Sequence, residues 1–265
     1  MNRELNIIVC VKQVPDPDGP PSAFEVDSEM KKVIPKGVPP VLSPFDENAL
    51  EAALRIKESS GGKITVISMG KKLAQRVLVK ALAAGADEMV LLQDDSFDDL
   101  DSYCTAFGLA AACKKIGKFD LILCGRQAAD SNAGQVGLGI AEILGIPAVA
   151  LVQKVELGDG NLNVEQLLPD GYAVLEVSMP VLLTMSSELY ELRYPTLPAL
   201  RAAQKKPMTM WSAKDVGVEV AQIKRDKVVK LYPRISEKNC ELITGETMEE
   251  LGINLALKLR EINVI

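Results

Sequence analysis

Short aliphatic runs alternate with helical patterns along the first part of this 265-residue chain, and this alternation constrains the fold most strongly. Parallel strands need long crossover connections between them, usually helices, and that is the order seen here. The sequence therefore predicts an α/β fold with a mainly parallel sheet and helices on both faces. The predicted strands are Asn6–Val14, Ile64–Ser68, Met89–Leu92, Phe119–Cys124 and Ala148–Val152.

The first predicted helix has both a start and a stop signal. Ser43 can cap it, Pro44 suits its first position, Asp46 completes a spacing like that of a capping box, and Gly61 ends it. Its pattern turns Leu50, Ala53 and Leu54 inward. Two further helices are predicted near Lys72–Ala84 and Asp98–Ile116.

The pattern changes after the fifth strand. Asp159-Gly160 and Asp170-Gly171 are turn signals between β-rich segments, so an antiparallel extension of the sheet is expected there. Near the amino terminus, Phe24–Ile34 is predicted to form a hairpin.

The last part of the chain has no repeated β/α unit. The segment RYPTLPALRAAQKKPM is rich in proline and basic residues, and it indicates an arm leaving the domain. A final helix is predicted with an apolar stripe of Met248, Leu251, Leu255, Leu259 and Ile262. We therefore divide the chain into an α/β domain, residues 1–190, and a C-terminal arm and helix, residues 191–265.

Composition excludes several classes of function. A net charge of −6 without a basic stripe argues against nucleic acid and anionic membranes as partners. The absence of histidine argues against a zinc hydrolase or a Ser-His-Asp enzyme. The five cysteines form no Cys-x-x-Cys pair, and no secretory or membrane-spanning segment is recognised, so reduced thiols in the cytoplasm are expected.

Phe119–Pro147 reads as a strand, a glycine-bearing loop and the start of a helix. Such a junction aims backbone N–H groups at one point, where the helix dipole favours an anion. It predicts a phosphate site, although a βα loop can also be rich in Gly and Asp merely to turn and cap. The candidate residues are Gly125, Gln127, Asp130, Ser131, Gly134, Gln135, Val136 and Gly137.

Gly137-Leu138-Gly139 resembles the start of a dinucleotide fingerprint, but it lies inside the predicted helix instead of directly after the strand. We interpret Gly139 as a packing residue. No Walker-type GxxxxGK[ST] sequence occurs. Lys12 lies toward the end of the first predicted strand and Gly70 follows the second, where a doubly wound sheet exposes its carboxyl edge to ligand.

Several segments together resemble the small, or β, subunit of electron-transfer flavoproteins. They are NIIVCVKQVPD, SPFDENALEAALRIKE, ALAAGADE, LILCGRQAADSNAGQVG with the LGIP that follows, PVLLT and RYPTLPALRAAQKK. The resemblance covers most of the chain and implies a Rossmann-like domain that binds an adenine nucleotide beside a larger, FAD-binding α subunit.

The resemblance also assigns site residues. The loop Asp130–Gly137 would hold phosphate, and Cys10, Ser43 and Met69 would line the nucleotide; many relatives have Asn where Ser43 stands. Leu197 would be the aliphatic anchor that docks into a dehydrogenase, with Lys205-Lys206 as the basic end of the docking loop.

The family shows two behaviours. Some members hold AMP in this site and relay electrons, whereas members from anaerobes hold FAD, oxidise NADH and bifurcate its electrons. The Gly37–Pro40 segment and the loop ADSNAGQVG are more similar to the anaerobe group, so FAD is expected as the cofactor, NAD(H) as the substrate, and bifurcation or its reverse as the reaction.

The expected partners are the α subunit, an acyl-CoA dehydrogenase or another flavin dehydrogenase, and ferredoxin or flavodoxin. Two alternatives remain open at this point. One is a nucleotide-binding module of the universal-stress type, and the other is a free-standing NAD-dependent dehydrogenase. The missing fingerprint and the missing histidine count against the second.

Overall fold

The computed structural model describes residues 4–158, 160–186, 190–233 and 240–265. Contacts divide the chain into two units, each described here by itself. The first, the α/β body, comprises residues 1–25 and 33–229; the second comprises residues 26–32 and 230–265.

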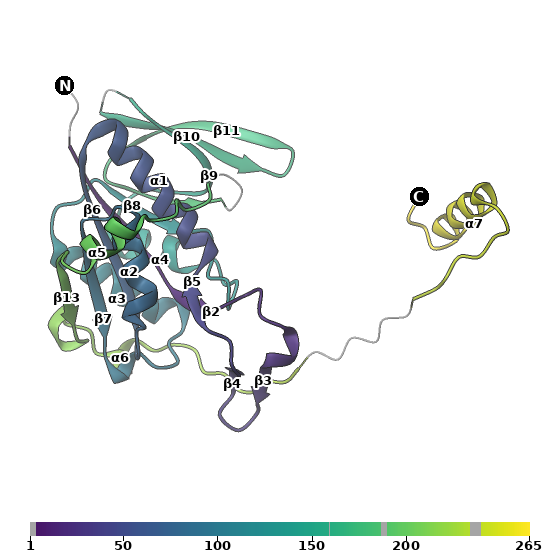
Figure 1. Cartoon of the computed structure of the whole chain (residues 1–265), viewed down its shortest axis with the longest axis horizontal. Coiled ribbons are helices and arrows are strands. Elements are labelled where there is room, and N and C mark those ends of the chain that lie inside the picture. Colours follow the sequence, from purple (N-terminus) through teal and green to yellow (C-terminus); the bar gives the residue numbers. More distant parts are fainter. Residues whose placement is uncertain (1–3, 159, 187–189, 234–239) are drawn as a thin grey trace. The chain divides into compact units, whose positions relative to one another are not determined.

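The strands and helices follow one another in the order shown in Figure 1. The strands are β1 Leu5–Cys10, β2 Gln13–Pro15, β3 Phe24–Asp27, β4 Lys32–Pro35, β5 Pro40–Leu42, β6 Gly62–Gly70, β7 Glu88–Gln93, β8 Leu121–Gly125, β9 Ala148–Leu157, β10 Asn161–Leu168, β11 Gly171–Ser178, β12 Val181–Met185 and β13 Met208–Trp211. The helices are α1 Pro44–Ser60, α2 Gln75–Ala84, α3 Ser102–Ile116, α4 Val136–Leu144, α5 Leu197–Ala203, α6 Val220–Ile223 and α7 Met248–Glu261.

One large sheet organises the α/β body. Within the described residues it has nine strands in the order β11-β10-β9-β12-β8-β1-β6-β7-β13. The pairs from β9 to β13 are parallel, and β10 and β11 are antiparallel to their neighbours. The predicted α/β class and the antiparallel extension are therefore confirmed.

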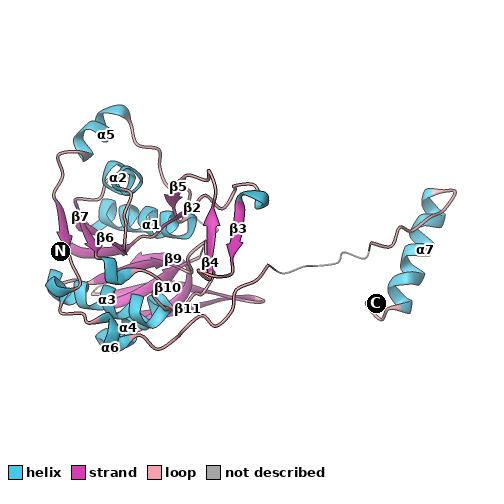
Figure 2. Ribbon diagram, turned by 90° about the horizontal axis from the view of Figure 1, so that it is seen from below, coloured by secondary structure: helices cyan, strands magenta, loops and turns pink. Residues whose placement is uncertain are grey.

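Helices cover both faces of this sheet, as Figure 2 shows: α1, α2 and α5 lie on one side, and α3, α4 and α6 on the other. Alternate residues of each strand face opposite sides. Ile7 and Val9 of β1 therefore join the core beneath α1 and α2, whereas Ile8 and Cys10 join the core beneath α3 and α4. The sheet is thus buried on both faces, which explains its aliphatic composition.

The strand order reverses between β1 and β8. The chain runs outward from β1 through β6 to β7 and then returns to place β8 on the other side of β1. In doubly wound sheets, ligands bind at the carboxyl edge where such a reversal occurs. The topology therefore locates the candidate site independently of any motif.

The first predicted strand, Asn6–Val14, is divided in the structure. β1 ends at Cys10, and β2 belongs to a separate two-stranded sheet with β5. The ladder ends because the backbone N–H of Lys12 donates to the carboxylate of Asp46 (2.8 Å) instead of to a neighbouring strand.

The turn at Asp170-Gly171 joins β10 and β11, as predicted. The other turn signal, Asp159-Gly160, includes Asp159, which lies outside the described residues. The hairpin predicted at Phe24–Ile34 is confirmed as the pair β3 and β4.

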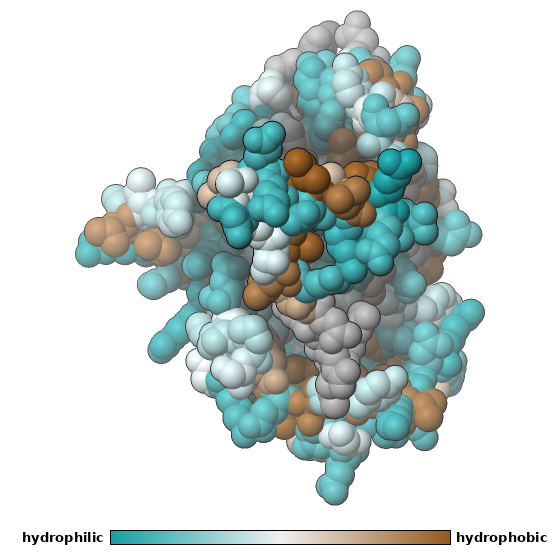
Figure 3. Space-filling model, turned by 90° about the vertical axis from the view of Figure 1, so that its right-hand side faces the viewer, coloured by the Kyte–Doolittle hydropathy of each residue, from teal (hydrophilic) through white to brown (hydrophobic). Residues whose placement is uncertain are grey.

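The described C-terminal residues contain α7. The Thr247 side chain caps it by accepting from the Glu250 N–H (3.2 Å), and Glu249 and Glu250 favour its positive end. No residue of α7 is buried in the described structure. Exposed apolar residues also interrupt the polar surface in the view of Figure 3. No helix among the described residues is long and apolar enough to cross a membrane.

Candidate nucleotide site at the sheet edge

A buried carboxylate joins the two strands at the point where the strand order reverses. Asp46, in the first turn of α1, accepts from the N–H of Lys12 (2.8 Å) and from the N–H of Gly125 (3.1 Å). Lys12 follows β1 and Gly125 ends β8, so this one side chain fixes both strand ends against the start of α1. Sequence analysis interpreted Asp46 only as part of a helix cap and missed this role.

Burial raises the pKa of Asp46 to about 7, although the N–H groups of Lys12 and Gly125 and the charge of Lys12 lower it. A carboxylate that accepts two hydrogen bonds is stabilised as an anion, whereas removal from water favours the protonated form. The edge therefore carries a group that titrates near neutral pH.

Gly125 is required by close packing at this edge. A Cβ on Gly125 would lie 2.6 Å from the carbonyl carbon of Phe45 and 2.6 Å from Asp46 Oδ1. Only glycine allows the first turn of α1 to approach the end of β8 this closely.

An ion pair holds the predicted phosphate loop to the end of β1. Lys12 Nζ lies 2.7 Å from each carboxylate oxygen of Asp130, and both side chains are partly exposed. Sequence analysis placed Lys12 at the carboxyl edge of the sheet without assigning it a partner. The structure places this cation at the mouth of the candidate site.

The loop between β8 and α4 turns sharply and is largely exposed. Asn132 (φ +51°) and Gly134 (φ +64°) both adopt left-handed backbone conformations. The Gln127 side chain donates to Asn132 Oδ1 (2.9 Å), and the Asn132 N–H donates to the Ala128 carbonyl (2.8 Å). Ser131 is exposed beside these residues.

The start of α4 lacks a side-chain cap. Gln135 is its N-cap residue, and its side chain makes no capping hydrogen bond. The first N–H groups of a helix have no partner within the helix, so those of Val136 and Gly137 can bind an anion. By contrast, Asp101 caps α3 by accepting from the Cys104 N–H (2.6 Å).

Gly137 and Gly139 also serve packing. A Cβ on Gly137 would lie 2.9 Å from Thr184 Cγ2 and 3.4 Å from Cys124 Cβ, and one on Gly139 would lie 2.9 Å from Ala106 Cβ. The interpretation of Gly139 as a packing residue is confirmed. Because Gly137 seats α4 on the sheet, a bulky substitution there would displace the helix as well as affect any ligand.

Ser43 is the clearest unsatisfied group at this edge. It precedes α1, its side chain forms no cap, and its Oγ is buried without a hydrogen-bond partner among the described residues. Ser43 therefore occupies the predicted N-cap position, but the predicted capping by its side chain is wrong. The backbone is held instead, since the Ser43 N–H donates to the Lys12 carbonyl (2.8 Å). A buried hydroxyl without a partner is costly, and a bound ligand would satisfy it.

Cys10 and Met69 lie on the α3–α4 side of the sheet. Cys10 belongs to a core that includes Cys113 and Cys124. The hydrogen bond with Cys10 and burial raise the pKa of Cys124, and burial raises that of Cys113, so both thiols stay neutral. All five cysteines are free. The Met69 side chain packs closely over Gly108 of α3.

Arg126 is a further residue that sequence analysis missed. Its guanidinium carbon lies 4.9 Å from the centre of the Phe45 ring, and its Nε is buried with no hydrogen-bond partner in the residues that the structure describes. Its position directly after Gly125 was the available signal, since the residue after a buried strand projects at the carboxyl edge.

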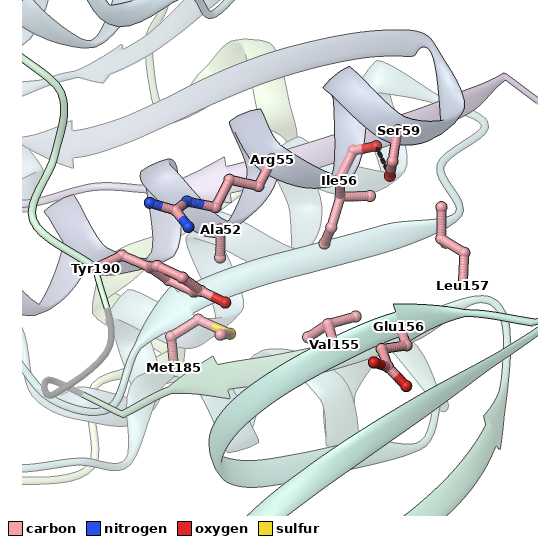
Figure 4. A pocket seen from close by; sticks show the side chains of 9 residues that line it. All are labelled: Ala52, Arg55, Ile56, Ser59, Val155, Glu156, Leu157, Met185 and Tyr190. Carbon is pink, nitrogen blue, oxygen red and sulfur yellow. Dashed lines mark hydrogen bonds between the residues drawn. The ribbon is translucent and has the colours of Figure 1, made fainter.

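A cavity of about 450 Å³ lies elsewhere, between α1 and β9, as Figure 4 shows. None of the predicted nucleotide-binding residues lines it. We therefore assign the nucleotide site by topology and by unsatisfied polar groups, not by cavity size.

The arm presents Leu197 at the first position of α5, where the residue is 75% exposed. One side of α5 packs on the body, with Leu200 against the core and Ala203 buried. Lys206 is not a free basic end, because its Nζ donates to the carbonyls of Leu82 (2.9 Å) and Ala86 (2.6 Å) at the end of α2. Lys205 is exposed.

Comparison with known proteins gives a consistent result. The electron transfer flavoprotein domain matches residues 31–216. The chain is 42% identical to the electron transfer flavoprotein subunit beta of Thermoanaerobacterium thermosaccharolyticum, over 98% of this chain and 100% of that protein. It is 38% identical to the caffeyl-CoA reductase-Etf complex subunit CarD of Acetobacterium woodii, with the same coverage.

A third relative, Protein FixA of Azorhizobium caulinodans, is 39% identical over 81% of this chain and 78% of its own length. The first two relatives match essentially from end to end, so the similarity includes the C-terminal residues as well as the α/β body. The chain belongs to the electron transfer flavoprotein family and is related to its β subunits.

Proposed function

We propose that this chain is the β subunit of a heterodimeric electron transfer flavoprotein that binds FAD at the edge between β1 and β8. There it passes electrons between NADH, a low-potential acceptor such as ferredoxin or flavodoxin, and a flavin dehydrogenase. The reaction is bifurcation or its reverse, confurcation, in the cytoplasm.

One observation carries the binding part of the proposal. The starts of α1 and α4, which have no side-chain cap, meet the carboxyl edge where the strand order reverses, and the buried Ser43 hydroxyl there has no partner in the described part of the chain. Such an edge suits the phosphates of an adenine nucleotide. The N–H groups of Val136 and Gly137 would face phosphate, and Lys12 would supply the nearest positive charge.

Bound FAD would supply the hydride and one-electron chemistry, and the protein supplies position and electrostatic environment. This division agrees with the absence of histidine from the chain. Cys124 and Cys113 are held neutral, so the proposal assigns them no thiolate chemistry.

We favour FAD over AMP because Gly37–Pro40 and the loop ADSNAGQVG are more similar to the anaerobe group. CarD is named as a subunit of a caffeyl-CoA reductase-Etf complex, and other close relatives include beta subunits from Clostridium acetobutylicum and Megasphaera elsdenii. An AMP-binding, non-bifurcating β subunit is the second candidate, because the same phosphate contacts serve both nucleotides.

Two surfaces would serve partners. The C-terminal arm and helix, residues 191–265, would pack on the α subunit, which would cover the exposed stripe of α7. Leu197 would dock on an acyl-CoA dehydrogenase or another flavin dehydrogenase.

The cofactor content of the co-purified α/β complex tests the proposal. Absorbance spectra and mass spectrometry of the released nucleotides should show more than one FAD per heterodimer. One FAD plus one AMP would refute bifurcation and leave the family assignment intact. Ser43→Ala should retain the fold and weaken binding of the β-subunit nucleotide, while Ser178→Ala, at the exposed end of β11, is the matched control.

A further inference from the structure

A buried glutamate on α1 faces the arm instead of the nucleotide site. The Glu51 side chain, in α1, is only 3% exposed. Glutamate is almost never buried without a partner, because removing its charge from water is costly. The partners of Glu51 therefore reveal what the structure holds in place.

Arg193 of the arm supplies those partners. Its Nε donates to Glu51 Oε2 (3.0 Å), its Nη2 donates to Glu51 Oε1 (2.8 Å), and its backbone N–H donates to Oε2 (3.2 Å). Two parallel guanidinium bonds fix direction as well as distance. The third bond fixes the backbone itself, so Glu51 determines the path of the chain at Arg193.

The contacts extend along one face of α1. Asn48, Glu51, Arg55 and Glu58 are spaced by three and four residues, which places them on one helix face. Asn48 Oδ1 accepts from the Tyr190 N–H (3.2 Å), and the Arg193 guanidinium reaches Glu58 beyond Glu51. We call Asn48, Glu51, Arg55, Glu58, Tyr190 and Arg193 the arm clasp.

Arg55 and Tyr190 complete the arm clasp. Arg55 donates to Glu51 Oε1 (3.0 Å), and its guanidinium carbon lies 4.2 Å from the centre of the Tyr190 ring. Figure 4 shows the two side chains together on one wall of the cavity between α1 and β9.

The charges of the arm clasp balance. Burial raises the pKa of Glu51, but hydrogen bonds from Arg193 and Arg55 outweigh this effect, so the pKa lies below its ordinary value. Glu51 and Glu58 hold the pKa of Arg193 above its ordinary value. Two carboxylates therefore face two guanidinium groups, and the charged forms of Glu51 and Arg193 are stabilised.

Two strongly exposed apolar residues follow the arm clasp along the chain. Tyr194 is 94% exposed and Leu197 is 75% exposed. The segment between them is held at its other end by α5, which packs on α2. The arm clasp at one end and α5 at the other thus hold the segment that exposes Tyr194 and Leu197. A segment that is already fixed loses less conformational entropy when it binds a partner.

We propose that Glu51 is a positioning residue for partner docking: through Arg193 it fixes the conformation in which Tyr194 and Leu197 meet the dehydrogenase. This proposal rests on the docking function proposed above for Leu197. It concerns a residue that touches neither the nucleotide nor the partner.

Glu51→Gln tests the proposal, because glutamine keeps the shape but loses the charge and one acceptor oxygen. Arg193→Lys is the second variant, since it keeps the charge and removes the two-pronged contact. Glu176→Gln, an exposed glutamate of β11 outside the arm clasp, is the matched control. All variants are studied in the α/β complex.

The first measurement is hydrogen exchange of the backbone amides of residues 190–197. Glu51→Gln and Arg193→Lys should speed exchange at Arg193 at least tenfold and leave the amides of β1 and β8 unchanged. The control should change exchange less than threefold. Unchanged exchange at Arg193 in both test variants would overturn the proposal, whatever the partner does.

The second measurement uses acyl-CoA dehydrogenase, reduced by its acyl-CoA substrate, as the electron donor. Glu51→Gln should raise the KM for the dehydrogenase about tenfold, with kcat and FAD content unchanged. In a Leu197→Ala background the same substitution should have little further effect, since it acts through that residue. Equal effects in both backgrounds would overturn the positioning role.

These results separate the two proposals. If Leu197→Ala leaves KM unchanged, the docking function fails, and the positioning role fails with it. If Leu197→Ala raises KM but Glu51→Gln does not, docking stands and only the positioning role is refuted.

Discussion

The α/β body and the C-terminal segment, residues 240–265, contain amphipathic helices with opposite fates. Of the 17 residues of α1, ten are buried, among them Leu50, Ala53 and Leu54, which the sequence pattern turned inward. Of the 14 described residues of α7, none is buried. Both α1 and α7 have apolar residues at helical spacing, so their different burial depends on the surface that each helix has to pack against.

This difference shows which helices find a partner for their apolar face within the chain. Burying a leucine or methionine side chain contributes about 1.5–3 kcal/mol, and an isolated helix of 14 residues is marginal in water. The stripe that includes Met248 and Leu255 gains this energy only against another surface. The α/β body thus buries its apolar helix faces in its own core. Under the proposed function, a partner subunit buries the apolar stripe of α7.

The largest effect is expected from Gly125→Ala in the body. The new Cβ would lie 2.6 Å from the Phe45 backbone, which cannot move without shifting α1. Unfolding in urea should show a loss of about 3 kcal/mol. Gly252→Ala in α7, where a Cβ meets nothing within 4 Å, is the control and should leave body unfolding unchanged. If the two variants lost the same free energy of unfolding, the proposed difference in packing between the body and α7 would be contradicted.

The next effect concerns the stripe of α7. Leu255→Asp should weaken association with the α subunit about 100-fold, or about 2.7 kcal/mol, while the melting temperature of the isolated β subunit stays the same. Sedimentation equilibrium of the mixed subunits measures the first quantity. Glu249→Gln on the same helix is the control. A large fall in melting temperature would show that α7 packs on its own chain.

A pH effect is expected at Asp46. Its pKa rises from 3.8 to about 7 on folding, so between these values the folded protein keeps a proton that the unfolded chain has lost. This group's contribution to stability therefore falls as pH rises from about 4 to about 7 and is constant above that range. The loss should be about 2 kcal/mol between pH 5 and pH 7.

Asp46→Asn should be less stable overall, because its single oxygen cannot accept from both Lys12 and Gly125. It should also lose this part of the pH dependence. Denaturant unfolding at several pH values measures both effects, with Asp170→Asn, in the exposed β10–β11 turn, as the control. An unchanged pH slope in Asp46→Asn would mean that Asp46 titrates normally.

The smallest effect is expected at the arm. Leu197→Ala should raise the KM for the partner dehydrogenase about tenfold, or about 1.4 kcal/mol, with flavin content unchanged. Stopped-flow reduction of the complex and its flavin spectrum measure the two quantities. Loss of flavin would indicate a structural role for Leu197. Leu200→Ala, which removes a side chain packed on the core, is the contrasting variant and should lower stability instead.

Periodicity predicted the elements of the body well because burial on both faces leaves aliphatic runs that the sequence displays directly. The sequence pattern predicted both ends of α1 correctly, because Pro44 favours a helix start and Gly61 favours a helix stop. The same reasoning missed Asp46 and Glu51. A helical pattern shows which apolar residues turn inward, but it does not show that a carboxylate turns inward to meet donors far along the chain.

The loop Asp130–Gly137 illustrates the same limit. Its glycines and its position after a strand were readable from sequence, and the resemblance to electron transfer flavoproteins supplied its expected ligand. The pairing of Asp130 with Lys12 and the packing role of Gly137 depend on neighbouring strands, so only the structure reveals them.

Native mass spectrometry of the 265-residue chain and of a variant ending at residue 229, each co-expressed with the α subunit, tests the central claim most directly. We expect the 265-residue chain to form a heterodimer with two FAD molecules, and the shortened chain to stay folded, retain nucleotide and no longer bind the α subunit. A shortened chain that loses its nucleotide, or one that still forms the heterodimer, would contradict the division between a self-sufficient body and a partner-dependent C-terminal segment.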